Sequence, residues 1–323
     1  MSDDYLWDRS GSPDPDVTGL EQLLAPLAHD APLRQRRSRA PWFVGGAFVA
    51  AAAALLIYLA LPGSSRGSCH GGEGFAFSGI GGEVSCGGGR VAKGTLPVGG
   101  KLETGAHEAA LAIADIGGAR LGKNTVVRLE RTDRERHQLA LDRGSMHAKV
   151  NAPPRLFAVT TPLTDVVDLG CEYDIMIADG GAGSLTVHNG LVELVTKAGT
   201  IVVVPEGCTA EILGDQRPGL PICKSATPGV VDAILEYDAG DRAAADTILA
   251  KVDRRDAVLL LALAAVDPAR RAAALARLAE LSPPPDAEIS AESAAANPAQ
   301  LAIWQQDVLA IYFGLWGPDA PPR

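Results

Sequence analysis

Residues 157–177 read FAVTTPLTDVVDLGCEYDIMI, and apolar and polar side chains alternate along much of this stretch. The clearest run is Tyr173, Ile175 and Ile177, whose members are each two residues apart. Successive side chains of a β-strand point to opposite faces, so a period of two is typical of strands with one buried face. Pro162 and Gly170 interrupt the alternation at places that favour turns. The stretch therefore predicts short strands joined by turns.

The same alternation extends to both sides, over residues 90–213. Glycine, asparagine, aspartate and proline separate the apolar runs at intervals of roughly ten residues. Further pairs of apolar residues with this spacing are Leu111/Ile113, Val127/Leu129, Leu139/Leu141, Leu185/Val187, Val192/Leu194 and Val202/Val204. Many short strands with turns between them predict an all-β domain, either a sandwich or a barrel-like or solenoid-like coil.

The ordered motifs of this region resemble the FecR domain, a family named for the ferric-citrate transport regulator. They are GGKLETGAHEAALAIADIGGARLGKNTVVRL, LALDRGSMHAKVN, FAVTTPLTDVVDLGCEYDIMI, SLTVHNGLVELV and TIVVVPEGCTAEI. The resemblance covers residues 97–213 and implies a periplasmic all-β domain that is not known for catalysis. In the archetype, such a domain follows a cytoplasmic anti-sigma segment and one membrane span. It relays a signal from an outer-membrane receptor to an extracytoplasmic-function sigma factor.

The five cysteines all follow residue 61, which fits a compartment where thiols are oxidised. Gly170-Cys171 stands where the FecR pattern has Gly-Thr, and together with Cys208 it implies a disulfide between two strands of the domain. Cys69 and Cys86 flank a possible hairpin, whose ends a second disulfide would join. One cysteine is then left over, or pairs between chains.

Residues 41–61, PWFVGGAFVAAAAALLIYLAL, carry no charge and predict one transmembrane helix. Four arginines lie between residues 34 and 39, which predicts a cytoplasmic N-terminus and periplasmic C-terminal domains in a bacterial inner membrane. A cleaved signal peptide would have a shorter apolar run nearer the start, and a buried core helix of this length would need a larger protein around it. We therefore expect a membrane-anchored chain with several domains.

Residues 1–39 are expected to be a cytoplasmic tail with one short amphipathic helix. Its apolar residues recur at helical spacing and are candidates for binding a partner; they include Val17, Leu20, Leu24 and Leu27. A helix of about a dozen residues is marginal in water without a surface on which to bury its apolar stripe. The alternative is a leader segment that matters only for membrane insertion.

The regions on either side of the β domain differ in composition. Residues 62–96 are rich in glycine and serine and predict a spacer with a possible hairpin. Residues 228–316 are rich in alanine and predict an all-α module, with helices over residues 229–237, 241–252, 253–266, 267–281 and 299–313. Trp304 and Trp316 add aromatic surface to the last helix and are further candidates for binding a partner.

Sequence motifs of catalysis are lacking: there is no G-x-S-x-G, no H-E-x-x-H and no C-x-x-C. Four histidines stand dispersed on expected strands or turns, in a way typical of surface side chains; they are His107, His137, His147 and His188. We therefore expect no enzyme, no cofactor and no metal. A net charge of -10 argues against nucleic acid as a partner.

The sequence thus predicts a non-enzymatic, membrane-anchored sensor or signal-relay protein of the FecR type. Its expected partners are a regulator inside, such as a sigma factor, and an envelope protein or glycan outside. The alternative is a structural module that is anchored in the same membrane and holds envelope glycan or protein.

Overall fold

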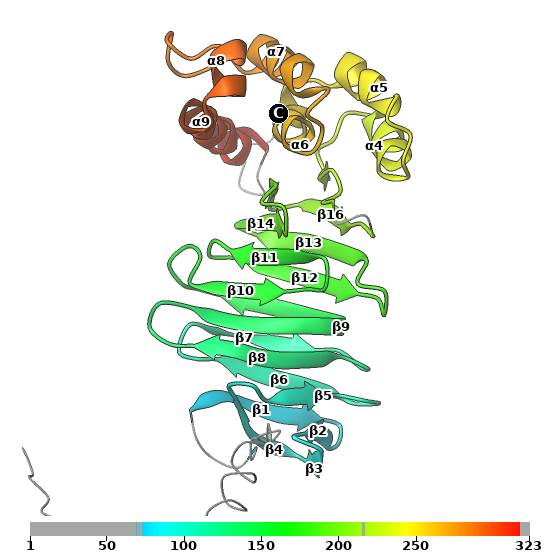
Figure 1. Cartoon of the computed structure of the whole chain (residues 1–323), viewed down its shortest axis with the longest axis vertical. Helices are drawn as coiled ribbons and strands as arrows, with labels where there is room; N and C mark the ends of the chain where they lie inside the picture. The colour runs from blue at the N-terminus through cyan, green and yellow to red at the C-terminus, as the bar shows by residue number, and fades with distance from the viewer. Residues whose placement is uncertain (1–68, 70–72, 215–216, 317–323) are drawn as a thin grey trace, which may run out of the picture. The chain divides into compact units, whose positions relative to one another are not determined.

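The computed structural model describes residue 69 and residues 73–214 and 217–316. All of these residues belong to one compact unit, residues 64–323. Within it, strands lie in successive layers from the end that holds β1 (Gly74–Ile80) to the end that holds β16 (Cys208–Ile212), and helices follow beyond β16 (Figure 1).

The described strands number seventeen. In addition to β1 and β16 they are β2 (Val84–Cys86), β3 (Gly89–Val91), β4 (Lys93–Pro97), β5 (Lys101–Glu103), β6 (Glu108–Ile113), β7 (Gly117–Leu121), β8 (Val126–Thr132), β9 (His137–Val150), β10 (Phe157–Thr160), β11 (Thr164–Asp168), β12 (Glu172–Ile177), β13 (Gly183–Asn189), β14 (Leu191–Thr196), β15 (Ile201–Pro205) and β17 (Ile222–Cys223).

These strands form two sheets that share one hydrophobic core. The first sheet has the order β4-β1-β6-β7-β9-β12-β13-β16-β17. The second has the order β3-β2-β5-β8-β9-β10-β11-β14-β15. Neighbouring strands are antiparallel, except that β10 is parallel to β9. The β domain is therefore a sandwich in which one long strand contributes to both layers.

Strand β9 changes sheet at Gly144. Residues 137–143 pair with β8 in the second sheet, whereas residues 144–150 pair with β7 and β12 in the first. Gly144 has a φ of 97°, and a Cβ atom at this position would lie 2.4 Å from the Cα atom of Thr125. Both the backbone conformation and the close approach require glycine, so Gly144 allows the corner.

The alternation in the sequence corresponds to the two faces of the sheets. In β12, Tyr173, Ile175 and Ile177 are buried in the core, while Asp174 and Met176 are exposed on the outer face. The prediction of a β-rich region over this part of the chain is confirmed.

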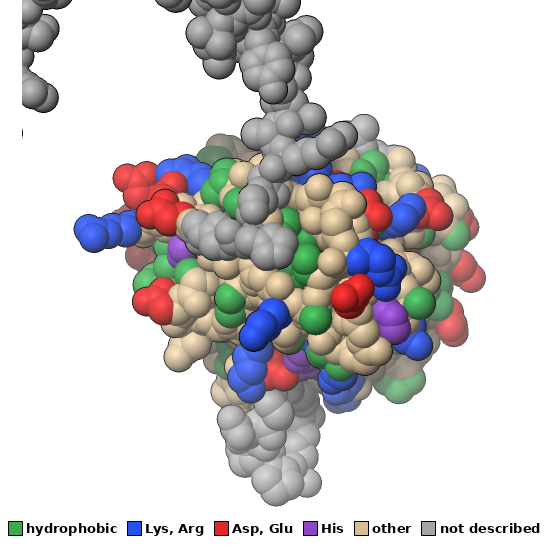
Figure 2. Space-filling model, turned by 90° about the horizontal axis from the view of Figure 1, so that it is seen from below, with side chains coloured by type: hydrophobic (Ala, Val, Ile, Leu, Met, Phe, Trp, Pro, Cys, Tyr) green, Lys and Arg blue, Asp and Glu red, His purple; other side chains and the backbone are tan. Residues whose placement is uncertain are grey.

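Strands also occupy the glycine-rich stretch for which we expected a spacer with a possible hairpin. Gly87 and Gly88 join β2 to β3, and both have positive φ, of 59° and 86°. A two-residue hairpin turn with both φ angles positive favours glycine, which explains this part of the composition. On the visible part of this end of the domain, charged side chains of both signs are interspersed and hydrophobic ones stand singly (Figure 2).

The C-terminal part of the chain is helical, as expected. The helices are α4 (Val230–Asp238), α5 (Ala244–Lys251), the short 3-10 helix η2 (Arg254–Asp256), α6 (Ala257–Val266), α7 (Arg271–Leu281), α8 (Ala291–Ala296) and α9 (Pro298–Trp316). Helix α8 was not predicted, because six residues are too few to show a helical period. Helix α6 packs against β15, so the helices continue the core of the β domain.

The predicted fold class requires one correction. Among the described residues, no helix has both the length and the apolar character needed to cross a membrane. Helix α6 is wholly apolar but has ten residues, where a span needs about twenty. The described fold is thus a large β domain followed by C-terminal helices. The predicted transmembrane helix, residues 41–61, and the tail, residues 1–39, lie outside the described residues.

Candidate functional site

The cysteines form two disulfides. Cys69 is bonded to Cys86, and Cys208 is bonded to Cys223 on the neighbouring strand β17. Cys171 is a free, buried thiol. The resemblance implied a disulfide between Cys171 and Cys208. In the structure, Cys208 is instead bonded to Cys223, across β16 and β17.

The thiol of Cys171 is enclosed at the start of β12. Its Sγ donates a hydrogen bond of 2.7 Å to Oδ2 of Asp168, and the backbone N–H of Gly170 donates to the other oxygen at 2.6 Å. Burial, and then the negative charge of Asp168, raise the pKa of Cys171 far above that of an ordinary thiol. Since the thiolate is the nucleophile, this cysteine has no reactive form near neutral pH.

We expect a maleimide to label the denatured, unreduced chain once and the native chain not at all. The four cysteines of the two disulfides have no free thiol to react, and folding buries the remaining thiol, that of Cys171. Mass spectrometry of the labelled chain counts the additions. Rapid labelling of the native chain, or three additions after denaturation, would show that this cysteine assignment is wrong.

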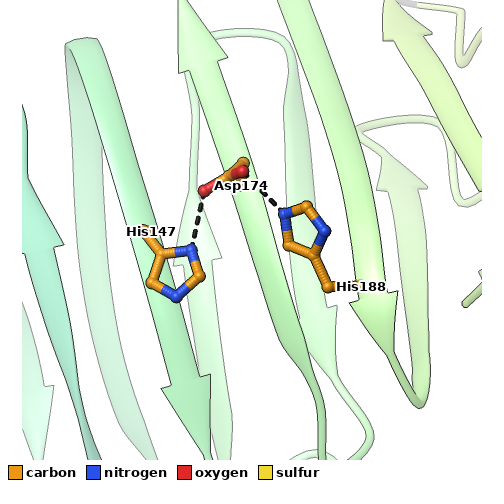
Figure 3. A group of neighbouring side chains, drawn as sticks. All are labelled: His147, Asp174 and His188. Atoms are coloured by element: carbon orange, nitrogen blue, oxygen red, sulfur yellow. Dashed lines mark hydrogen bonds and ion pairs between the residues drawn. The ribbon is translucent and has the colours of Figure 1, made fainter. Parts of the chain in front are cut away.

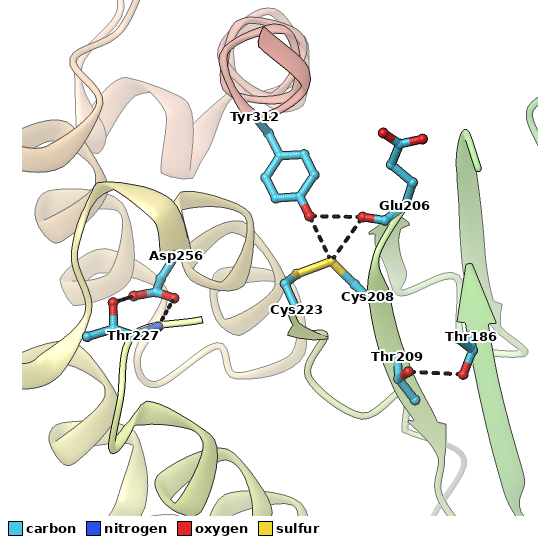
Figure 4. The surroundings of a disulfide bond; sticks show 8 residues. All are labelled: Thr186, Glu206, Cys208, Thr209, Cys223, Thr227, Asp256 and Tyr312. Carbon is cyan, nitrogen blue, oxygen red and sulfur yellow. Dashed lines mark hydrogen bonds between the residues drawn. A yellow bond between two sulfur atoms is a disulfide. The ribbon is translucent and has the colours of Figure 1, made fainter. Parts of the chain in front are cut away.

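The second disulfide lies where the helices meet the β domain (Figure 4). The hydroxyl of Tyr312, on α9, donates to the backbone oxygen of Glu206 at 2.9 Å and lies 3.3 Å from Sγ of Cys208. Asp256 accepts a hydrogen bond of 3.1 Å from the backbone N–H of Thr227, in the segment that enters α4. The contacts of Tyr312 hold α9 against the end of the sandwich, and the contact of Asp256 holds the segment before α4 against η2.

A groove of about 390 Å³ lies between β15, with the turn that precedes it, and residues of the four helices α6, α7, α8 and α9. Its lining is mostly apolar and comprises Ala198, Gly199, Thr200, Ile201, Val202, Val203, Val258, Leu261, Ala262, Ala265, Arg271, Ala294, Ala295, Pro298, Leu301, Gln305 and Leu309. The guanidinium of Arg271 donates to the backbone oxygen of Ala264, so its charge is engaged. This groove is suited to receiving apolar side chains, and its lining offers no group for acid–base chemistry.

Three polar side chains meet on the outer face of the first sheet and form what we call the His-Asp-His cluster (Figure 3). It consists of His147 on β9, Asp174 on β12 and His188 on β13. Nδ1 of His147 lies 2.8 Å from one oxygen of Asp174, and Nε2 of His188 lies 2.6 Å from the other. The strand register places them together, because His147 and Asp174 are directly opposite one another. The side chains are half exposed.

A second carboxylate, Glu172, flanks the cluster. It lies two residues before Asp174 on the same face of β12, and its Oε1 is 3.3 Å from Nε2 of His147. Lys149 neutralises Glu172 at 2.8 Å, and this hydrogen bond lowers the pKa of the Glu172 carboxyl. At Asp174, partial burial raises the pKa of the carboxyl. The hydrogen bonds with His188 and His147 together outweigh this effect, so the pKa of Asp174 is lowered.

Of the residues that the sequence marked for partner binding, Trp304 is the one whose side chain the structure describes. Trp304 is fully buried, and its indole N–H donates to the backbone oxygen of Ser282 at 3.0 Å. Trp316 is the last residue of α9. The tail residues Val17, Leu20, Leu24 and Leu27 lie outside the described residues.

Sequence reasoning treated His147 and His188 as separate surface side chains. They are 41 residues apart in the chain, and only the pairing of their strands with β12 brings them together. The signal in the sequence was limited to their shared outward position on strands whose other residues alternate into the core.

A comparison with models of protein families agrees with the resemblance. Residues 100–193 match the family model described as FecR protein. Two crystal structures of a candidate anti-sigma factor from Parabacteroides distasonis ATCC 8503 are similar to part of the chain, each with 16% identity and a TM-score of 0.34. The similarity covers 42% of this chain and 64% of each of those chains, which is less than two thirds of their length. No curated protein has a significantly similar sequence.

The matched residues run from just before β5 into β14 and include the corner at Gly144 and the His-Asp-His cluster. The fold is thus that of a β-sandwich domain with a C-terminal set of helices. Within it, residues 100–193 match the FecR family model, and over these residues the resemblance seen in the sequence is confirmed.

Proposed function

We propose that this protein is a non-enzymatic signal-relay protein of the FecR type, which controls a sigma factor through the apolar stripe of residues 1–39. The FecR match over residues 100–193 carries this proposal. The unit that holds the FecR domain receives the signal, in the form of a protein partner. Its two disulfides favour an oxidising compartment as the place where this unit works.

The chemistry of the described residues supports a binding role over catalysis. The one free thiol among them is buried against Asp168, and its raised pKa withholds the thiolate. The groove between β15 and the helices offers apolar surface, which suits the side chains of a protein segment. Burial of apolar surface is the dominant favourable contribution in most protein–protein association.

The test is to cross-link the full chain in its native host and to identify the captured proteins by mass spectrometry. We expect the natural chain to capture a sigma factor and the Leu24→Asp variant to capture about tenfold less of it. A charged side chain in an apolar interface lowers the affinity by at least a factor of about ten. A reporter gene of that sigma factor measures the output. Gln22→Asp is the matched control, because Gln22 lies on the opposite side of the expected helix from Leu24.

Equal recovery of the sigma factor with Leu24→Asp and Gln22→Asp would contradict the role of the apolar stripe. Recovery of envelope proteins or glycan alone, with no sigma factor, would contradict the relay. That second result would favour the structural alternative, in which the same unit only holds an envelope component.

A further inference from the structure

We propose that the His-Asp-His cluster is a binding site for a divalent transition-metal ion of the Zn²⁺ type. Each of its three residues offers one ligand atom, and these atoms lie within 4.8 Å of one another. Two imidazole nitrogens and a carboxylate oxygen are a donor set that Zn²⁺ prefers. The site is independent of the proposed signal relay, since it rests on the outer face of the sheet alone.

To admit an ion, ligand atoms that lie within 4.8 Å of one another must come closer by up to about 1.5 Å. Zinc lies about 2.0–2.2 Å from its nitrogen and oxygen ligands, so tetrahedral ligand atoms are roughly 3.3 Å apart. In the described structure, the two nitrogens lie 2.8 and 2.6 Å from the carboxylate oxygens of Asp174. Side chains that are half exposed rotate by this amount without disturbing the core. The strands below them, β9, β12 and β13, are paired and hold the Cα positions fixed.

Glu172 provides a further feature of metal sites. Metal-bound histidines commonly donate the N–H of their other ring nitrogen to a carboxylate, which fixes the tautomer and the orientation of the ring. His147 directs Nδ1 at Asp174 and Nε2 at Glu172, at 2.8 and 3.3 Å. Nδ1 is thereby available as the ligand atom. Glu172 is accordingly a positioning residue for His147.

The charges around the cluster also favour a cation. Two basic residues lie nearby on the same face, but each is engaged by another carboxylate: Lys149 by Glu172 at 2.8 Å, and Arg120 by Glu108 at 2.9 Å. With both pairs neutral, the carboxylate of Asp174 leaves one net negative charge among these residues. The ion would face solvent on its outer side and keep a position there for water or for a carboxylate or imidazole of another molecule.

The experiment uses the full chain without a histidine tag, after chelation of bound metal. Titration with Zn²⁺ in a calorimeter gives the stoichiometry and affinity, and titration with Co²⁺ gives the absorption bands of tetrahedral nitrogen and oxygen coordination. We expect one ion per chain. We expect His147→Ala and His188→Ala each to abolish this binding, and Glu172→Gln to weaken it about tenfold to a hundredfold.

His107→Ala is the matched control, because His107 lies outside the cluster in the turn before β6. The variants of the cluster are surface substitutions and should leave the circular dichroism spectrum unchanged. Binding that is absent from the natural chain, or that survives in both His147→Ala and His188→Ala, would overturn the proposal. An unchanged affinity in Glu172→Gln would remove the positioning role of that residue.

Discussion

Gly144→Ala is expected to lower the free energy of unfolding of the described unit by about 3 kcal/mol. The residue has a φ of 97°, which an L side chain disfavours. The added Cβ atom would also lie 2.4 Å from the Cα and Oγ1 atoms of Thr125, so the backbone of the corner must move. Denaturation of the full chain by urea, followed by circular dichroism, measures the change.

Gly199→Ala separates the two causes. Gly199 has a similar φ of 85°, but no atom lies within 4 Å of the position of its Cβ. This variant carries the backbone strain alone and should cost about 1 kcal/mol. Equal losses in the two variants would show that the contact with Thr125 is unimportant, and that the change of sheet at Gly144 tolerates a side chain.

The sequence predicted the strands better than their pairing. Alternation is a local property, so Tyr173, Ile175 and Ile177 identify a strand and its buried face without any partner. No local pattern shows that the first half of β9 pairs with β8 and the second half with β7 and β12. The choice between a sandwich and a coil depends on this pairing, and it therefore remained open.

Because strand pairing is not visible in the sequence, the sequence also did not show which residues of the candidate site lie together. Cys208 pairs with Cys223 because β17 lies beside β16, and β17 has only two residues, too few to show alternation. The cluster depends on three strands that bring His147 and His188 to either side of Asp174. In each case the residue types were visible in the sequence, but their neighbours were set by strand order.

Trp304→Ala is expected to lower the free energy of unfolding by about 4 kcal/mol. The side chain is fully buried, and its removal leaves a large cavity between α9 and the other helices. The backbone oxygen of Ser282 also loses the hydrogen bond from the indole. Trp304→Phe keeps most of the apolar volume and should cost less. The melting temperature and the helical circular dichroism signal measure both losses.

The sequence marked Trp304 as a candidate for partner binding, but the spacing of the buried residues along α9 indicates a structural role for it. Trp304, Val308 and Tyr312 recur at helical spacing and are all buried, so the tryptophan belongs to the inward face. Ile303 is the matched control: it is 50% exposed, and Ile303→Ala should change stability by less than about 0.5 kcal/mol. If Trp304→Ala kept full stability and lost a captured partner instead, α9 would have to open to expose this side chain.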